Sequence, residues 1–252
     1  MEASPKAAIA NTLDSNAWLT SALGRACFHL NLKTPISDDD QLGRLMRALA
    51  TDGVFIDTKL AVDRLDLAGD LETHGFRLID TNLRFGRAAG RGAMRQIPGV
   101  AVRSAEPPDR FGVESLARRS FQVSRFHADP QIPPDKANDI KARWASNFFK
   151  GARGDHMIVA EAAGGIVGFL QLLAPGGGLL VIDLIAVAAS HRGRGIAGAM
   201  IAAAEGECGR PDRLSVGTQL ANAASIALYQ RNGFQLDGAQ YVFHYHGARN
   251  RP

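Results

Sequence analysis

Two segments in the second half of the chain contain residue types suited to binding a phosphate-bearing ligand. The first, Arg192-Gly193-Arg194-Gly195-Ile196-Ala197, follows an apolar run and precedes a stretch of small residues with helical composition. Glycines let a backbone approach a diphosphate, the free N–H groups of a helix N-terminus point at it, and arginines add charge-assisted hydrogen bonds. This segment therefore predicts a phosphate-binding turn between a strand and a helix.

Other interpretations of the glycine segment differ in how well the spacing fits them. Gly193 to Gly198 matches the dinucleotide pattern GxGxxG, but five residues separate its first glycine from Val187 at the end of the apolar run. The acidic residue expected about 20 positions later is also missing, and Thr218 and Gln219 occupy that region. A Walker loop is excluded because no Gly-Lys-Ser/Thr follows. A purely structural helix entry with two exposed arginines stays open.

A second segment narrows the choice. Asn222-x-x-Ser225-x-x-Leu228-Tyr229-x-x-x-Gly233-Phe234 lies downstream of the glycine segment. The pair resembles the Q/R-x-x-G-x-G/A loop and the N-x-x-A-x-x-L-Y-x-x-x-G-F segment of the GNAT superfamily of acetyltransferases, over about Val100 to Tyr245. Ser225 replaces the more usual alanine, which is a small change.

The resemblance implies an enzyme that transfers acetyl from acetyl-CoA to a primary amine by direct attack. It also implies that the strand Leu179 to Val187 splays from its neighbour near its C-terminal end. Backbone groups there would pair with the pantetheine and polarise the thioester carbonyl. The residues expected to bind the donor are Ile185, Ala186, Val187, Arg192, Gly193, Arg194, Gly195, Ile196, Ala197 and Asn222.

Tyr229 occupies the position that the family uses to protonate the departing thiolate. It lies two helical turns beyond Asn222, so both side chains face the same way. The alternatives are that Tyr229 is a core aromatic residue and Asn222 only a helix cap. We expect the catalytic role for Tyr229.

A base for the amine is harder to identify. Asp183 is the one charge in the strand Leu179 to Val187, and a buried carboxylate is costly unless it is paired. It is the candidate general base or orienting group, with Glu161 as another candidate and a water chain as the alternative. His244 and His246 share a face of a strand, but no third ligand accompanies them, so we expect no metal site.

The elements that must position these residues follow from hydrophobic patterning. After Asp155 the order is hairpin, strand, helix, strand, helix, strand, which predicts a mixed α/β sheet with the GNAT fold. The segment Gly86 to Pro98 has three glycines and a proline and is typical of a linker. We therefore expect a smaller N-terminal α/β domain over residues 1–92 and the acetyltransferase domain over residues 93–252.

A short sequence pattern occurs in both the N-terminal and the C-terminal part of the chain. His74-Gly75-Phe76 ends a predicted helix and starts a predicted strand, as Asn232-Gly233-Phe234 does later. This recurrence suggests that the N-terminal part is a truncated GNAT-like unit. The alternative is that Gly-Phe after a helix is a common cap.

Bulk properties exclude several functional classes. The chain has 252 residues, 46% of them hydrophobic and 21% charged, with a net charge of +4. The basic residues are scattered, which argues against nucleic acid as a partner. Two distant cysteines, no leader-like N-terminus and no long apolar run predict a cytoplasmic protein without membrane contact. A homodimer is compatible with these properties.

The acceptor is indicated only by a weaker resemblance in the first half of the chain. Short segments, among them Leu13 to Asn16, Phe55 to Leu60 and Ser124 to Pro130, resemble the bacterial dTDP-fucosamine acetyltransferases. That group acetylates the 4-amino group of a nucleotide-linked 4-amino-4,6-dideoxygalactose. Arg125 is then the candidate contact to a sugar-nucleotide phosphate, or else a surface arginine in a turn. Another small amine, a peptide N-terminus or a non-catalytic acyl-CoA-binding role remain alternatives.

Overall fold

The computed structural model describes residues 11–37, 41–49, 53–90 and 96–247. The chain divides into two compact units, Met1–Thr81 with Ala239–Pro252 (unit 1) and Asn82–Gly238 (unit 2). This division differs from the boundary expected at residues 92/93. The reason is that two long strands, β4 (Arg77–Ala88) and β10 (Gln235–His246), each begin in one unit and end in the other.

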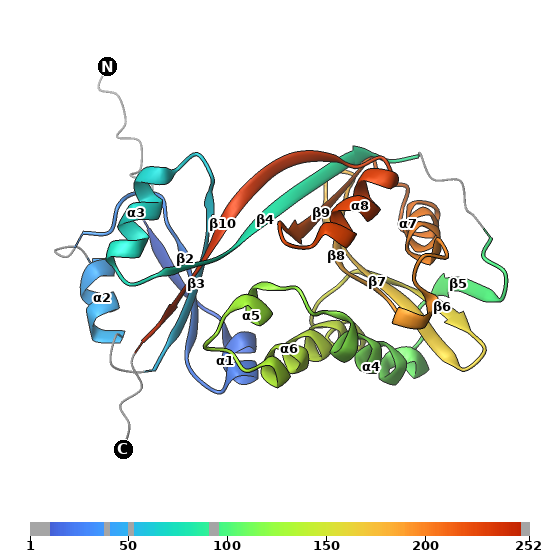
Figure 1. Cartoon of the computed structure of the whole chain (residues 1–252), viewed down its shortest axis with the longest axis horizontal. Coiled ribbons are helices and arrows are strands. Elements are labelled where there is room, and N and C mark those ends of the chain that lie inside the picture. The colour runs from blue at the N-terminus through green and yellow to red at the C-terminus, as the bar shows by residue number, and fades with distance from the viewer. Residues whose placement is uncertain (1–10, 38–40, 50–52, 91–95, 248–252) are drawn as a thin grey trace. The chain divides into compact units, whose positions relative to one another are not determined.

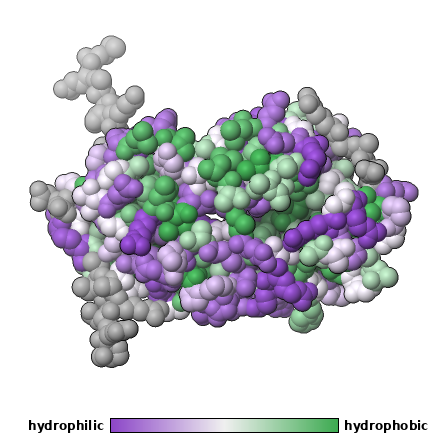
Figure 2. Space-filling model, viewed as in Figure 1, coloured by the Kyte–Doolittle hydropathy of each residue, from purple (hydrophilic) through white to green (hydrophobic). Residues whose placement is uncertain are grey.

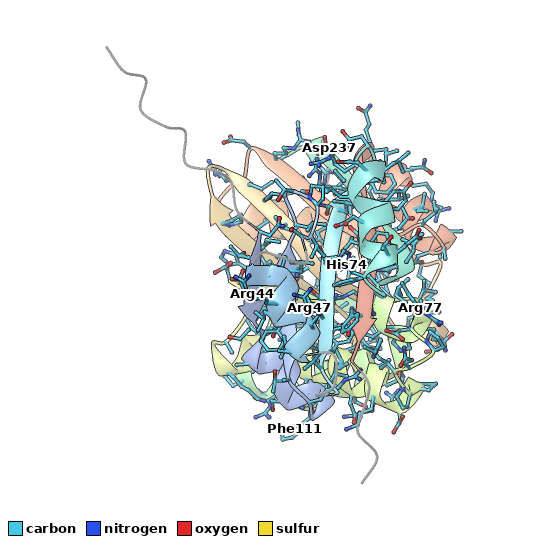
Figure 3. All side chains as sticks on the ribbon, turned by 90° about the vertical axis from the view of Figure 1, so that its left-hand side faces the viewer. Arg44, Arg47, His74, Arg77, Phe111 and Asp237 are labelled. Atoms are coloured by element: carbon cyan, nitrogen blue, oxygen red, sulfur yellow. The ribbon has the colours of Figure 1, made fainter. Side chains whose placement is uncertain are left out.

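Unit 1 contains a mixed sheet in the order β1–β2–β3–β10–β4. Strands β2 and β3 are parallel, whereas β1 and β10 are antiparallel to their neighbours β2 and β3. The helix α2 is amphipathic, because Leu42 and Met46 are buried while Arg44 and Arg47 are exposed, as Figure 3 shows. In chain order its elements are β1 (Thr12–Ser15), α1 (Ala17–Leu23), β2 (Cys27–Asn31), α2 (Gln41–Leu49), β3 (Phe55–Ala61), α3 (Leu65–Thr73), the first part of β4 and the last part of β10.

Unit 2 contains a sheet in the order β4–β9–β8–β7–β6–β5, in which only the pair β8 and β9 is parallel. The predicted order from hairpin to final strand is confirmed, but the sequence pattern predicted none of β5, α4 and α5. After the last part of β4, the elements are β5 (Val100–Ser104), α4 (Arg110–Ser120), α5 (Arg125–Ala128), α6 (Pro134–Ser146), β6 (His156–Ala162), β7 (Gly165–Gly176), β8 (Leu179–Val187), α7 (Ile196–Glu207), β9 (Arg213–Gln219), α8 (Ala223–Arg231) and the first part of β10.

Helices cover both faces of the unit 2 sheet (Figure 1). Successive side chains of β6 point to opposite faces of the sheet. Met157 and Val159 belong to the core beneath α4 and α6, whereas Ile158 and Ala160 belong to the core beneath α7 and α8. The outer side of the α4–α6 layer is largely hydrophilic (Figure 2), as expected for helices with one buried face. No helix in the described part of the chain is long and apolar enough to cross a bilayer.

Strand β8 changes its orientation halfway along its length. Leu172 of β7 pairs with Ile182, and the preceding Gln171 pairs with Leu184, so Asp183 is the extra residue of a β-bulge. Before the bulge, the even-numbered Ile182 points to the α7 side; after it, the even-numbered Leu184 points to the α4 side. The bulge therefore decides which side chains of β8 face α7 near the C-terminal end of the strand.

The predicted linker from Gly86 to Pro98 begins inside a strand. Asn82 to Ala88 pair with β9, and the buried Arg87 forms an ion pair of 2.6 Å with the buried Glu205 of α7. Gly86 is one reason to predict a linker. In the structure this glycine makes room for the guanidinium of Arg213, because a Cβ atom at position 86 would lie 2.5 Å from it. Residues 91–95 of the predicted linker lie outside the described residues.

Unit 2 should fold only if β4 is included. We expect a fragment of residues 82–238 to unfold cooperatively on heating, and a fragment of residues 93–238 to lack a cooperative transition. The shorter fragment leaves one side of β9 without its partner strand and leaves Glu205 as an unpaired buried charge, which alone costs about 3–5 kcal/mol. Circular dichroism during heating measures the difference; equal transitions in both fragments would contradict it.

Candidate active site

Strands β8 and β9 separate partway along their length. Their parallel pairing runs from Leu179 with Arg213 to Ile182 with Val216, yet β8 continues to Val187 and β9 to Gln219. The splay that the family resemblance implied is therefore present. Beyond the separation, the backbone of β8 that faces β9 has no ladder partner among the described strands. Its N–H and C=O groups are therefore open to a ligand, apart from the carbonyl of Val187, which accepts a hydrogen bond from Arg192.

A cavity of about 1210 Å³ lies at this separation. It is lined by the end of β8, the glycine segment, the first two turns of α7 and one side of α8. Nine of the ten residues expected to bind the donor line it, and the structure therefore brings together Ile185, Ala186, Val187, Arg192, Gly193, Gly195, Ile196, Ala197 and Asn222.

The glycine segment has the conformation of an anion-binding turn. Gly193 and Gly195 have φ of +76° and +85°, a region that L side chains rarely adopt. A Cβ at Gly193 would meet nothing within 4 Å, so the backbone conformation, not crowding, requires glycine there. Gly195 directly precedes α7, whose first N–H groups have no partner within the helix. Together these groups form a site of positive potential at the helix N-terminus.

The two arginines of this segment are used differently. Arg192 lines the cavity, and its Nε donates a hydrogen bond of 3.1 Å to the carbonyl of Val187, which ties the turn to the end of β8. Arg194 is not among the lining residues, and its guanidinium donates to the carbonyl of Pro98 at 3.4 Å. A direct role for Arg194 in binding the donor therefore has less support than one for Arg192.

Asn222 serves as the predicted helix cap and also lines the cavity. Its side-chain oxygen accepts a hydrogen bond of 3.2 Å from the backbone N–H of Ser225, which satisfies one of the free donors at the start of α8. Ser225 and Leu228 continue the cavity-facing side of α8. The functional and the capping interpretations of Asn222 are therefore compatible.

Tyr229 is packed in the core beneath the cavity. It is 3% exposed, and its ring lies 6.1 Å from that of Phe85 and 5.7 Å from that of Phe234. Burial raises the pKa of its phenol above the ordinary value, so the residue keeps its proton at neutral pH. Its hydroxyl has no hydrogen-bond partner in the described part of the protein, and Tyr229 is not among the lining residues.

Asp183 is fully engaged by its neighbours and lies outside the cavity lining. Its carboxylate accepts hydrogen bonds from Arg153 at 2.8 and 2.7 Å, from Trp144 at 2.9 Å and from Gln171 at 2.9 Å. The expected partner is therefore present. A general base needs an oxygen free to accept a proton from the amine, and this arrangement argues for a structural role instead.

Glu161 and Arg125, the other candidates, are also held elsewhere. Glu161 accepts hydrogen bonds of 3.1 and 2.8 Å from Arg103, which also pairs with Asp109. The guanidinium of Arg125 lies 4.5 Å from the centre of the Phe126 ring, and Arg125 lines neither this cavity nor the hollow formed by Arg118, Gln122 and His127. Neither residue lines the cavity at the end of β8.

The sequence did not reveal a second hollow, of about 550 Å³, beside the donor cavity. Gln122 lines both, and the connection between α4 and α5 thus forms a shared wall. Side chains with polar groups predominate among the residues that line the second hollow, which are Arg118, Arg119, Gln122, His127, Pro134 and Asn138. The sequence pattern singles out the segment Ser124 to Pro130, which contains His127, but it identifies only Arg125 as a candidate there.

A hydrogen-bonded chain fixes this wall. The buried Ser124 lies 2.7 Å from Nδ1 of His127, whose Nε2 lies 3.1 Å from the side-chain oxygen of Asn138. Burial lowers the pKa of His127 below its ordinary value, so the imidazole is neutral at pH 7. A neutral ring donates from Nε2 and accepts at Nδ1, which matches both partners. The chain therefore joins α5 to α6 beside the donor cavity.

Comparisons with known proteins agree with this geometry. Residues 114–234 match the model of the acetyltransferase (GNAT) family. The spore coat polysaccharide biosynthesis protein SpsD of Bacillus subtilis is 36% identical over 141 residues, which are 55% of this chain and 48% of that protein. The chain thus spans about half the length of this curated relative.

Solved structures show the same fold. A GCN5-related N-acetyltransferase from Sphaerobacter thermophilus has a TM-score of 0.61 at 15% identity, covering 96% of this chain and 78% of that one. A tandem GNAT protein from the clavulanic acid biosynthesis pathway has a TM-score of 0.60 at 12% identity, covering 89% and 76%. The open mixed sheet, the separation of β8 and β9 and these solved structures show that the chain has the GNAT fold, and residues 114–234 match the model of that family.

Proposed function

We propose that the chain transfers the acetyl group of acetyl-CoA to the primary amine of a nucleotide-linked amino sugar, and that the amine attacks the thioester directly. The observation that carries the proposal is the free edge of β8, which opens into a cavity bounded by the glycine turn at the start of α7. The likeness to a protein named for spore coat polysaccharide biosynthesis supports a sugar as the acceptor.

In this proposal the donor lies along the free edge of β8. The backbone of Ile185 and Val187 would pair with the pantetheine, and an N–H group there would stabilise the negative charge that develops on the thioester oxygen. The turn at Gly193 and Gly195 would hold the diphosphate with backbone N–H groups. These contacts use rigid elements, which suits a reaction that depends on holding two substrates in contact.

Tyr229 would stabilise the departing thiolate. A free thiol has a pKa of about 8.5, below that of the buried phenol, so complete proton transfer from Tyr229 is unfavourable. A hydrogen bond from the neutral phenol to the thiolate carries no such penalty and is strong when the acceptor is charged. Burial thus supports a donor that holds its proton and stabilises the leaving group.

We assign the deprotonation of the amine to water and not to Asp183 or Glu161. Both carboxylates accept hydrogen bonds from arginines, which stabilise their charged form and make them weaker bases. The polar hollow beside Gln122 would admit the acceptor, because amide, imidazole and guanidinium groups suit a ligand rich in hydroxyl groups. An acetyltransferase for another amine, or a non-catalytic acyl-CoA-binding module, is the alternative.

Release of free thiol from acetyl-CoA across a panel of amines tests the function. We expect turnover with a nucleotide-linked amino sugar to exceed turnover with a free amino sugar, a polyamine and a peptide with a free N-terminus. The matched control is the same sugar nucleotide with a hydroxyl in place of the amine, which should give no thiol. Tight acetyl-CoA binding without turnover on any amine would instead support the regulatory module.

Tyr229→Phe should lower kcat by about 100-fold, the lower end of the range for proton-donating groups. Stability should change little, because the described structure gives the hydroxyl no protein partner to lose. Steady-state kinetics and thermal unfolding measure the two effects. Tyr241→Phe, in the part of β10 that belongs to unit 1, is the control. Full activity in Tyr229→Phe would refute the assignment.

Asp183→Asn should lower the free energy of unfolding by about 1–3 kcal/mol, because the amide leaves buried donors without an acceptor. The pH dependence of kcat should keep its shape, since water removes the proton. The exposed Asp135, changed to Asn, is the control for the loss of one negative charge. A stable Asp183→Asn variant whose pH profile loses the acidic limb, along which activity falls as a base is protonated, would restore Asp183 as the base.

A further inference from the structure

Arg231 stands at the C-terminal end of α8 and lines the donor cavity. It is exposed, and the described part of the chain gives its guanidinium no ion pair or hydrogen bond. A cationic side chain that lines a cavity and has no protein partner is available to bind a ligand. None of the motifs in the sequence requires an arginine at this position.

The end of α8 that carries Arg231 lies beside the phosphate-binding turn. A Cβ built on Gly198, in the first turn of α7, would be 2.9 Å from the side-chain oxygen of Asn232. The start of α7 and the end of α8 are therefore in contact at this glycine. Arg231 precedes Asn232 and lines the cavity, so it borders the ligand space next to the start of α7.

The other arginines near the cavity are already engaged. Arg87 is buried, forms an ion pair with Glu205 and lies over the Phe234 ring at 4.9 Å. Arg192 is bonded to the carbonyl of Val187, and Arg194 to that of Pro98. Of the described arginines that line the cavity, Arg231 alone has a guanidinium without a protein partner.

Acetyl-CoA carries phosphate in two places, a diphosphate and a separate 3′-phosphate monoester on the ribose. The backbone N–H groups of the turn suit the diphosphate. The wall that carries Arg231 is the C-terminal end of α8, which presents carbonyl groups and the negative end of the helix dipole. Only a cationic side chain can attract a phosphate to that wall, and a guanidinium fits one with two parallel hydrogen bonds.

We propose that Arg231 recognises the 3′-phosphate of the acyl-CoA donor and so selects CoA over 3′-dephospho-CoA. This inference rests on the proposed function only in taking an acyl-CoA as the ligand of the cavity. It concerns the donor alone and is independent of which amine is acetylated.

Calorimetric titration with CoA and with 3′-dephospho-CoA tests the proposal without any acceptor. The unmodified protein should bind CoA about 10-fold more tightly, the contribution expected of one charge-assisted contact at an exposed site. Arg231→Ala should lose this preference by weakening CoA alone, and Arg231→Lys should keep part of it. Arg77→Ala, an exposed arginine of β4 in unit 1, controls for the loss of one positive charge and should leave both affinities unchanged.

Equal binding of the two ligands by the unmodified protein would overturn the proposal, as would an Arg231→Ala variant that weakens both equally, because Arg231 would then serve the diphosphate or the fold. Neither result affects the proposed acetyl transfer, which the amine panel tests separately. Conversely, a protein that prefers CoA through Arg231 but acetylates no amine would support this inference while refuting the enzyme. Failure of both ligands to bind would overturn both.

Discussion

The separation of β8 from β9 after Ile182 and Val216 is the feature on which the rest of unit 2 depends. Two parallel strands that stay paired to their ends bury their backbone groups against each other and leave nothing for a ligand. Here β8 remains paired with β7 up to Val187 while its other edge becomes free. A rigid strand with one unpaired edge can hold a long, polar chain by backbone hydrogen bonds, and the cavity follows from that edge.

Asp183 stabilises this separation at the position where it begins. It is the bulged residue directly after the last β8 residue paired with β9, and its carboxylate receives donors from α6, from β7 and from the segment before β6. The bulge turns Ile185 and Val187 to the side of α7, where the cavity lies. A charge in the middle of an apolar strand suggested catalysis from the sequence, because the sequence could not show that its partners lie 12 to 39 positions away.

The local turns that line the cavity could be predicted from the sequence, whereas positions set by long-range pairing could not, for a physical reason. The glycine turn and the cap at Asn222 are local structures, set by the conformational freedom of Gly193 and Gly195 and by a side chain three residues from its partner. Positions decided by long-range pairing were harder. Gly86 and Arg87 had linker composition yet form a strand against β9, and Arg125 had the right charge yet stacks on its neighbour Phe126. The polar hollow at His127 draws on three elements that no single motif joins.

Unit 1 repeats the pattern of unit 2 without its chemistry. In each unit four residues of one strand pair in parallel with the next strand, a helix follows, and a glycine with positive φ and a buried phenylalanine lead into a long strand. The backbone N–H of Phe76 bonds to Leu71, as that of Phe234 bonds to Tyr229, both at 3.0 Å. The tyrosine position thus holds a leucine in unit 1. Between β2 and α2 the sequence has no glycine but three consecutive aspartates, Asp38 to Asp40, which would repel a phosphate. We therefore propose that unit 1 is a truncated GNAT-like unit that shares this framework with unit 2 but has no counterpart of the glycine turn among its described residues.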